Sequence, residues 1–415
     1  MIYIVLKHPL FRFRLGLVNV VVLNDFASIK KYLSMEATLN RSHRSIFEGV
    51  TNGMTTLSGP AWVENRRFCL RVLKDLGFGK KTMEEHIKVR HMQRVLYPVF
   101  PPGDAAPVLP GLQRSTFVLI LPFCVRHLYP LSDPRAMINK RLLSHLGRLQ
   151  LFSSSQHGSR QSRSCGTALA SIGLYHSWFA SYLRERVKEH QGTIDPNFNR
   201  DFIDGYLNKV REHQNNPNSH FREAYLLGNA IDFFVAGTGT VAASVQWHLL
   251  NCAKHADTVQ SVIQREIDNV IGREREPTWE DRSQMHFTMA CVWEMLRWRT
   301  VVPLGLPRGY ARRRFYNACT YLNYSTQDTV IKILLPVFWY LEDIFEPTYL
   351  LLYLNYICKR MCPAEALTTV EIFLYLTTLL QKFRVLPEGQ QLPNLGSPSL
   401  TVAHPSLQRL RFIPR

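Results

Sequence analysis

The run Lys359-Arg360-Met361-Cys362-Pro363-Ala364-Glu365-Ala366-Leu367 places a cysteine at the start of an apolar helix, which we expect to end near Phe383. A thiolate at a helix N-terminus accepts hydrogen bonds from backbone N–H groups and meets the positive end of the helix dipole. Its pKa is therefore lowered, and it can bind a metal ion. The alternative is that Cys362 is only a small buried apolar side chain, and this motif alone favours neither interpretation.

The charge of the chain is strongly positive. Fifty Lys and Arg against 32 Asp and Glu give a net charge of +18 over 415 residues, which favours an acidic protein, an anionic membrane or nucleic acid as a partner. The basic residues are spread along the chain and no nucleic-acid motif has its proper spacing, so we expect no nucleic-acid binding. A basic scaffold for an acidic protein or a membrane surface remains an alternative.

The eight cysteines are scattered, and no secretory leader precedes them. A disulfide framework is therefore not expected, and a reducing compartment fits better. Cys358 and Cys362 lack a second pair or a nearby His, which argues against structural zinc. No stretch reaches the roughly 18 uninterrupted apolar residues that a membrane span needs.

Two patterns define the expected secondary structure. Residues 11–15 alternate between apolar and basic side chains, and residues 18–23 are mainly β-branched and apolar. With Gly16 between them, the two stretches predict a strand pair. Elsewhere apolar residues recur at helical spacing, and polar residues such as Arg184, Glu185, Arg186 and Lys188 occupy opposite faces. This spacing predicts helices over 62–76, 175–190, 229–252, 261–271 and 287–299. Residues 92–173 show poor periodicity, first rich in Pro and then in Ser, Gln and Arg, so we expect a loop-rich insert there.

The helix over 229–252 carries one charged residue before its end, Asp232. We expect it to run through the middle of the protein. Gly237 and Gly239 each cost about 1 kcal/mol relative to Ala within a helix, which indicates that something approaches the backbone closely. The alternative is a loosely packed core helix.

Glu294 and Arg297 lie three residues apart on the helix over 287–299, so their side chains can pair. The flanking Trp293 and Trp298 predict a buried pair with a structural role. The alternative is a surface pair worth a few tenths of a kcal/mol.

Four motifs occur in the order typical of one family. They are Trp62-x-x-x-Arg66, Ala236-Gly237-Thr238-Gly239-Thr240, Glu294-x-x-Arg297 and Arg360-x-Cys362. The chain resembles a cytochrome P-450, in particular the animal microsomal xenobiotic and fatty-acid hydroxylases. Further similar stretches are found at 76–80, 199–204, 264–268 and 302–305. The resemblance covers roughly residues 8–91, 174–310 and 355–395.

The resemblance implies a mainly α fold with a small β-sheet, forming one heme-thiolate domain over residues 1–415 in which 92–173 diverge. It implies that Cys362 is the axial thiolate of heme b, which favours O–O cleavage by pushing electron density toward the iron. Thr240 would assist proton delivery, and Ala236 and Gly237 would let the helix pass over the heme. The residues implied to hold the propionates, a task suited to the guanidinium fork, are Trp62, Arg66, Arg308 and Arg360.

The implied activity is insertion of one oxygen atom from dioxygen into a small apolar substrate, a xenobiotic or a lipid. Electrons would come from NADPH through a flavoprotein reductase. We expect this reductase to dock on basic residues near Cys362, namely Arg67, Arg71, Lys74, Lys80, Lys81 and Lys359. The implied location is the cytoplasmic face of the endoplasmic reticulum. Because the chain starts near the first strand, without anchor or hinge, we expect at most peripheral membrane contact.

Three positions depart from the family pattern. Residues 355–358 read Asn-Tyr-Ile-Cys where the family has two glycines in the loop around the thiolate. Gly239 replaces the acid that precedes the proton-relay Thr, and Tyr349 replaces the Arg that completes a triad with Glu294 and Arg297. The alternative is therefore a non-catalytic, truncated relic of such an enzyme with impaired heme binding.

Overall fold

The computed structural model is mainly helical with two small sheets, which confirms the predicted fold class. Most of 92–173, all of 355–358, Tyr349, Lys80 and Lys81 lie outside the part of the chain that it describes. That part comprises residues 10–15, 18–23, 25–41, 52–77, 84–85, 105–108, 112, 180–302, 306, 308–309, 329–332, 359–389 and 409–415.

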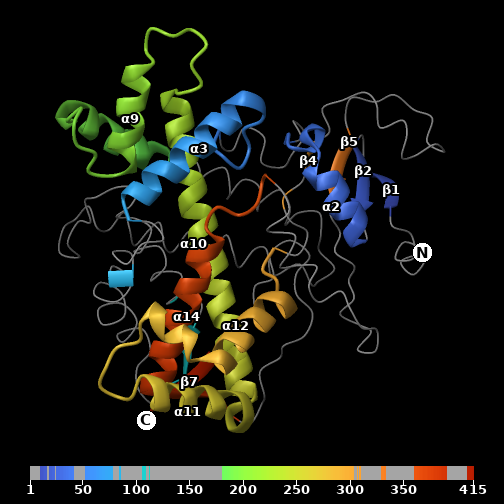
Figure 1. The fold of residues 1–415 in the computed structure, drawn as a ribbon, viewed down its shortest axis with the longest axis vertical. Helices are drawn as coiled ribbons and strands as arrows, with labels where there is room; N and C mark the ends of the chain where they lie inside the picture. The colour runs from blue at the N-terminus through green and yellow to red at the C-terminus, as the bar shows by residue number, and fades with distance from the viewer. Residues whose placement is uncertain are drawn as a thin grey trace.

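Helix α10, Glu223–Lys254, runs along the long axis of the molecule (Figure 1) and contacts α9, α12, α14 and β6. By length and composition alone it could cross a membrane, but 67% of its most apolar 18-residue window is buried inside the protein. Its apolar surface is thus covered by other elements. The prediction of a central helix over 229–252 is confirmed, and the helix extends beyond both expected ends.

One end of α10 is surrounded by α3 (Gly59–Asp75), α9 (Phe202–Glu212) and a helix over 180–193. Aromatic rings fill the space between them. Phe68 of α3 lies edge-on to Tyr206 of α9 with ring centroids 5.6 Å apart, a favourable geometry for aromatic pairs. The prediction that Arg186 lies on the polar, exposed face of its helix is wrong, because Arg186 is 3% exposed. Its guanidinium lies 5.5 Å from the Tyr182 ring and forms an ion pair with Glu189.

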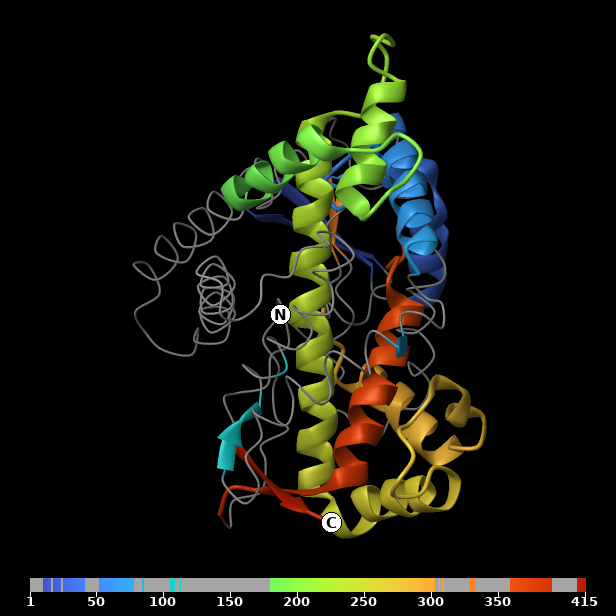
Figure 2. The ribbon, with the colours of Figure 1, turned by 90° about the vertical axis from the view of Figure 1, so that its left-hand side faces the viewer.

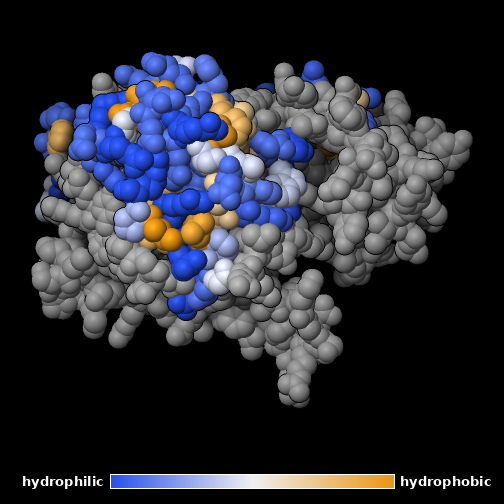
Figure 3. Space-filling model, turned by 90° about the horizontal axis from the view of Figure 1, so that it is seen from below, coloured by the Kyte–Doolittle hydropathy of each residue, from blue (hydrophilic) through white to orange (hydrophobic). Residues whose placement is uncertain are grey.

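The other end of α10 packs against the C-terminal half of the chain (Figure 1). The elements there are η3 (Ala256–Gln260), α11 (Ser261–Val270), η4 (Trp279–Ser283), α12 (His286–Trp298), α14 (Glu365–Lys382), β6 (Phe383–Pro387) and β7 (Arg409–Pro414). The helices match the predicted ones to within a few residues. From below, the described surface is mainly hydrophilic with separate apolar patches (Figure 3).

Buried glutamine amides join these elements. Gln260 donates to the carbonyls of Cys252 at 3.0 Å and Val385 at 2.8 Å, and it accepts from the Val385 N–H at 2.7 Å. Its amide therefore links the end of α10 to β6 without leaving a polar atom unsatisfied. Glu371 of α14 is different. It is 1% exposed and one carboxylate oxygen has no partner within the described part of the chain, so desolvation raises its pKa to about 8.

The two sheets lie at different ends of the molecule (Figure 1). β1, Leu10–Leu15, pairs antiparallel with β2, Val18–Leu23, which confirms the predicted strand pair. β2 continues in parallel with β5, Thr329–Lys332, and β4, Arg308–Gly309, completes the order β1-β2-β5-β4. Helix α2 (Phe26–Ser34) follows β2 in the chain. Its N-cap is Asp25, whose side chain accepts from the Ser28 N–H at 2.9 Å. The second sheet has the order β3-β7-β6, with β3 at Ala105–Pro107.

The segment 52–58 is pressed against α10. A Cβ atom added at Gly53 would collide with the Asp232 carboxylate and the Gly228 carbonyl, and one at Gly228 would collide with the backbone of Asn52 and Gly53. Among the described glycines, this is the close approach to α10 that the structure records. The close approach that the sequence predicts at Gly237 and Gly239 stays a prediction.

Replacing Gly53 by Ala should lower the free energy of unfolding by about 1–3 kcal/mol, because backbone atoms on both sides must move to admit the methyl group. Urea titration followed by circular dichroism measures this loss. Gly192→Ala is the matched control, since nothing lies within 4 Å of its added Cβ. Equal stability of the two variants would contradict the close packing.

Candidate heme-thiolate site

Cys362 lies two residues before the N-cap of α14. The helix begins at Glu365 with Ala364 as its N-cap, and the backbone N–H of Ala364 is hydrogen-bonded to the thiol. Cys362 is exposed, so it is not the small buried apolar side chain of the alternative interpretation. Neighbouring protein atoms still desolvate its thiol and raise the pKa, helped by the charge of Glu365, although Ala364 and Arg66 act to lower it. The predicted lowering is wrong because desolvation outweighs the helix terminus.

Arg66 and Trp62 bring α3 next to Cys362. Arg66 Nη2 donates to the carbonyl of Met361 at 2.6 Å, and its guanidinium lies 5.9 Å from the centre of the Trp62 ring. Trp62 is 4% exposed, and its Nε1–H has no acceptor among the residues that the structure describes. A buried donor without an acceptor is costly, so this N–H indicates where an acidic group of a ligand can be held.

Arg360 makes backbone contacts that the resemblance did not predict. It is 8% exposed, and its guanidinium donates to the carbonyls of Leu39 at 2.7 Å, Met54 at 3.2 Å and Leu57. The same guanidinium lies 3.9 Å from the centre of the Trp62 ring, a favourable cation–π distance. These contacts tie the Cys362 segment to two N-terminal segments. The structure thus shows an anchor for the backbone at this position.

Arg308 is also buried, at 6% exposure, in β4. The adjacent Gly309 donates its N–H to the carbonyl of Asn40 at 2.8 Å. Arg41 Nε in turn donates to the carbonyl of Thr55 at 2.7 Å. The short strand is therefore joined to the same N-terminal segments that hold Arg360.

The middle of α10 has an open side. Val235 is 43% exposed and Ala236 is exposed, whereas most of the surrounding helix is buried. Thr240 is half-buried, and its hydroxyl donates to the carbonyl of Ala236 at 2.6 Å. Gly237 is half-buried and Gly239 is buried. Figure 2 shows that α10 and α14 converge toward β6 and diverge toward the start of α14, so the Cys362 segment stands away from α10.

Glu294 and Arg297 pair as predicted, but they do so at the surface. Arg297 Nε lies 2.7 Å from Glu294 Oε2, and Nη2 binds the other oxygen. The side chain of Glu294 is 56% exposed, so the prediction of a buried pair is wrong. Trp298 packs against the hydrophobic cluster shared with α10 and α14, whereas the Glu294 side chain faces solvent. The third position of the triad, Tyr349, lies outside the described residues.

Asp232 and Thr55 belong to the site region but were missed as a pair. Asp232 is 6% exposed and accepts from the Thr55 N–H at 2.8 Å and from the Thr55 hydroxyl at 2.7 Å. The isolated charge of Asp232 within an apolar helix was a signal that a partner exists. Nothing in the sequence near Thr55 identified it as that partner.

Comparison with known proteins shows the family of the chain. The cytochrome P450 family model matches residues 6–312. Cytochrome P450 2C20 of Macaca fascicularis is 31% identical and human cytochrome P450 2C8 is 30% identical, each over 98% of this chain and 87% of the relative. Human cytochrome P450 2J2 is 27% identical over 98% of this chain and 84% of the relative. The chain belongs to the cytochrome P450 family, and thus to a class of monooxygenases with a heme-iron cofactor.

The residues of this site fit heme. Cys362 is an exposed residue that offers a thiolate ligand, and the Trp62 Nε1–H and the Arg66 guanidinium beside it are suited to carboxylates. The match to the family model ends at residue 312, before Cys362, whereas the alignments with the relatives extend over almost the whole chain.

Arg360→Gln should lower the free energy of unfolding by about 2–4 kcal/mol, because three carbonyls would lose a charged donor in a buried place. We also expect faster proteolysis within 39–58, since Arg360 anchors those segments. Arg67→Gln on the exposed side of α3 is the control and should be nearly neutral. Thermal unfolding and limited proteolysis measure both effects. Unchanged proteolysis in Arg360→Gln would contradict the anchor.

Proposed function

We propose that this chain is a heme-thiolate monooxygenase that inserts one atom of dioxygen into a small apolar substrate, a xenobiotic or a lipid. The observation that carries the proposal is Cys362 exposed at the start of α14, with the unpartnered Nε1–H of Trp62 on the adjacent helix. Family membership supplies the reaction class. The apolar nature of the substrate is our inference from the exposed Val235 and Ala236 on the open side of α10.

In this proposal each residue has a separate task. Cys362 binds the iron of heme b, which when bound supplies the oxygen-activating chemistry, with electron density from the thiolate. Trp62, Arg66, Arg308 and Arg360 would hold the carboxylates, and Arg360 also keeps the Cys362 segment in place. Thr240 carries an O–H close to the open side of α10, where it can pass a proton. Ala236 and Gly237 leave room beside the helix.

Electron supply is proposed to come from NADPH through a flavoprotein reductase. Arg67, Arg71 and Lys74 are exposed along one side of α3, and Lys359 is exposed next to Cys362. Arg66 joins α3 to Met361, so this basic surface adjoins the thiolate segment. An acidic partner would be steered toward it. We place the protein at the cytoplasmic face of the endoplasmic reticulum.

The alternative is a relic that binds heme weakly and does not turn over. Gly239, buried before Thr240, cannot carry a proton where the family has an acid. Heme stoichiometry after supply of hemin, and NADPH-dependent product formation with the reductase, separate the relic from the enzyme.

Purified protein loaded with hemin, reduced and exposed to carbon monoxide should show the Soret band of thiolate-bound heme. Cys362→Ser should lose that band, because a serine hydroxyl does not replace the thiolate as an electron donor. Cys291→Ser, on α12, is the matched control and should keep it. A thiolate-type spectrum that survives Cys362→Ser would reject the ligand assignment.

Reversing charge in Arg71→Glu/Lys74→Glu should slow reduction by the reductase about 10-fold or more at low ionic strength, and the difference should shrink as salt is added. Stopped-flow reduction at several ionic strengths measures this. Arg184→Glu/Lys188→Glu carries the same charge change on the exposed side of the 180–193 helix. If both double variants are reduced equally fast, the docking surface is wrongly placed.

A further inference from the structure

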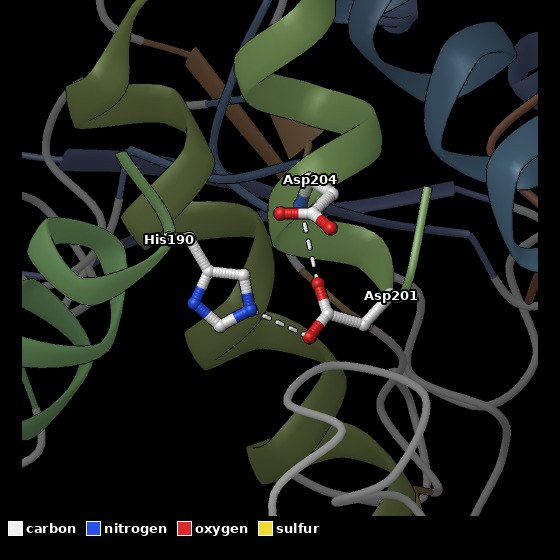
Figure 4. Close-up of side chains that lie close together, drawn as sticks. All are labelled: His190, Asp201 and Asp204. Atoms are coloured by element: carbon white, nitrogen blue, oxygen red, sulfur yellow. Dashed lines mark hydrogen bonds and ion pairs between the residues drawn. The ribbon is translucent and has the colours of Figure 1, made fainter. Parts of the chain in front are cut away.

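A buried cluster of ionisable side chains lies away from the heme-thiolate site, where the 180–193 helix meets the start of α9 (Figure 4). His190, Asp201 and Asp204 are 4%, 0% and 0% exposed. Asp201 is the N-cap of α9, and its Oδ1 accepts from the backbone N–H of Asp204 at 3.1 Å. The stretch 199–204 is one that the resemblance singled out and that the proposed activity does not use.

The cluster is better described as an ion-pair network than as a metal site. His190, Asp201 and Asp204 each offer a ligand atom within 4.8 Å of the others. Both oxygens of Asp204, however, accept from the guanidinium of Arg200, with Nη2 at 2.9 Å from Oδ1. The charges of Arg200 and a protonated His190 balance those of the two carboxylates. A divalent cation would add uncompensated charge to a buried, already neutral group.

The hydrogen bonds of His190 specify its protonation. Nδ1 lies 2.7 Å from the carbonyl oxygen of Arg186, and Nε2 lies 2.8 Å from Asp201 Oδ2. Both partners present acceptor oxygens, and a neutral imidazole can donate from only one nitrogen. The second contact therefore requires a further proton between Nε2 and Oδ2.

We propose that His190 and Asp201 share this proton as a pH-dependent latch, which holds the 180–193 helix against the start of α9. Loss of the proton would leave two lone pairs facing each other inside the protein. The buried Tyr182, Leu183 and Val187 pack with residues of α9 and the first part of α10 in the same hydrophobic cluster. Opening the latch loosens that cluster at its edge.

The surroundings agree with a protonated ring. Desolvation lowers the pKa of His190, but the hydrogen bond to Asp201 and its charge, the Arg186 carbonyl and the charge of Asp204 outweigh it, so the pKa is raised above 6.5. Other charged groups near this junction face elsewhere: Arg186 binds Glu189 at 2.7 Å, and Glu223 of α10 accepts from Gln191 at 3.2 Å.

The raised pKa fixes the direction of the pH effect. Below about pH 6.5 both the closed and the open state hold the proton, and the latch contributes fully. Between that value and the pKa in the folded protein, the open state loses its proton first. The equilibrium constant for local opening then rises about tenfold per pH unit.

The test uses the full chain labelled with ¹³C-histidine, with His190→Gln to assign the resonance. We expect the His190 resonance to titrate above pH 6.5. Asp201→Asn keeps a side chain that caps α9 but removes the negative charge, so it should move this titration below that of the wild type. Hydrogen exchange of amides 191–204, corrected for intrinsic rates, should show opening that increases with pH in the wild type and not in His190→Gln.

His286→Gln, at an exposed position of α12, is the control and should leave exchange in 191–204 unchanged. A His190 resonance that titrates below pH 6.5 would overturn the latch. So would exchange in 191–204 with the same pH dependence in the wild type and His190→Gln. These readouts need no heme, so they are independent of the proposed activity.

Discussion

The structure around Cys362 depends on one constraint, the position of the 52–58 segment between α10 and the start of α14. Asp232 of α10 accepts two hydrogen bonds from Thr55, and Arg360 donates to the carbonyls of Met54 and Leu57. Gly53 and Gly228 permit the backbones to approach closely. A single short segment thereby fixes the distance between the central helix and the thiolate, which come from sequence positions more than a hundred residues apart.

Two kinds of buried charge serve different purposes in this molecule. Asp232, Arg360 and the His190 network each have strong hydrogen-bond partners, so their burial specifies how segments meet. Glu371 has an unpartnered oxygen and a pKa raised to about 8, so it is neutral below that pH and costs less to bury. The paired groups lie at junctions between elements, whereas Glu371 lies within the fully buried part of α14.

An active enzyme and the alternative, a non-catalytic relic, would share this fold and differ in a few residues. The donors suited to heme carboxylates are present on α3, and the open side of α10 is formed by small residues. Gly239 counts against turnover, because it stands where the family has an acid. Because the scaffold is shared by both, the distinction lies in proton supply and in heme binding, not in the fold.

The sequence by itself determined the strand pair, the principal helices, the central position of α10 and the order of motifs, because periodicity and helix-end chemistry are local properties. It did not determine that Glu294 is exposed, that Arg360 binds carbonyls or that Arg186 is buried. Nor did it find the partners of Asp232 and His190. Only the tertiary structure decided these, because burial and hydrogen-bond partners depend on which distant segments meet, and residue spacing along one helix carries no record of them.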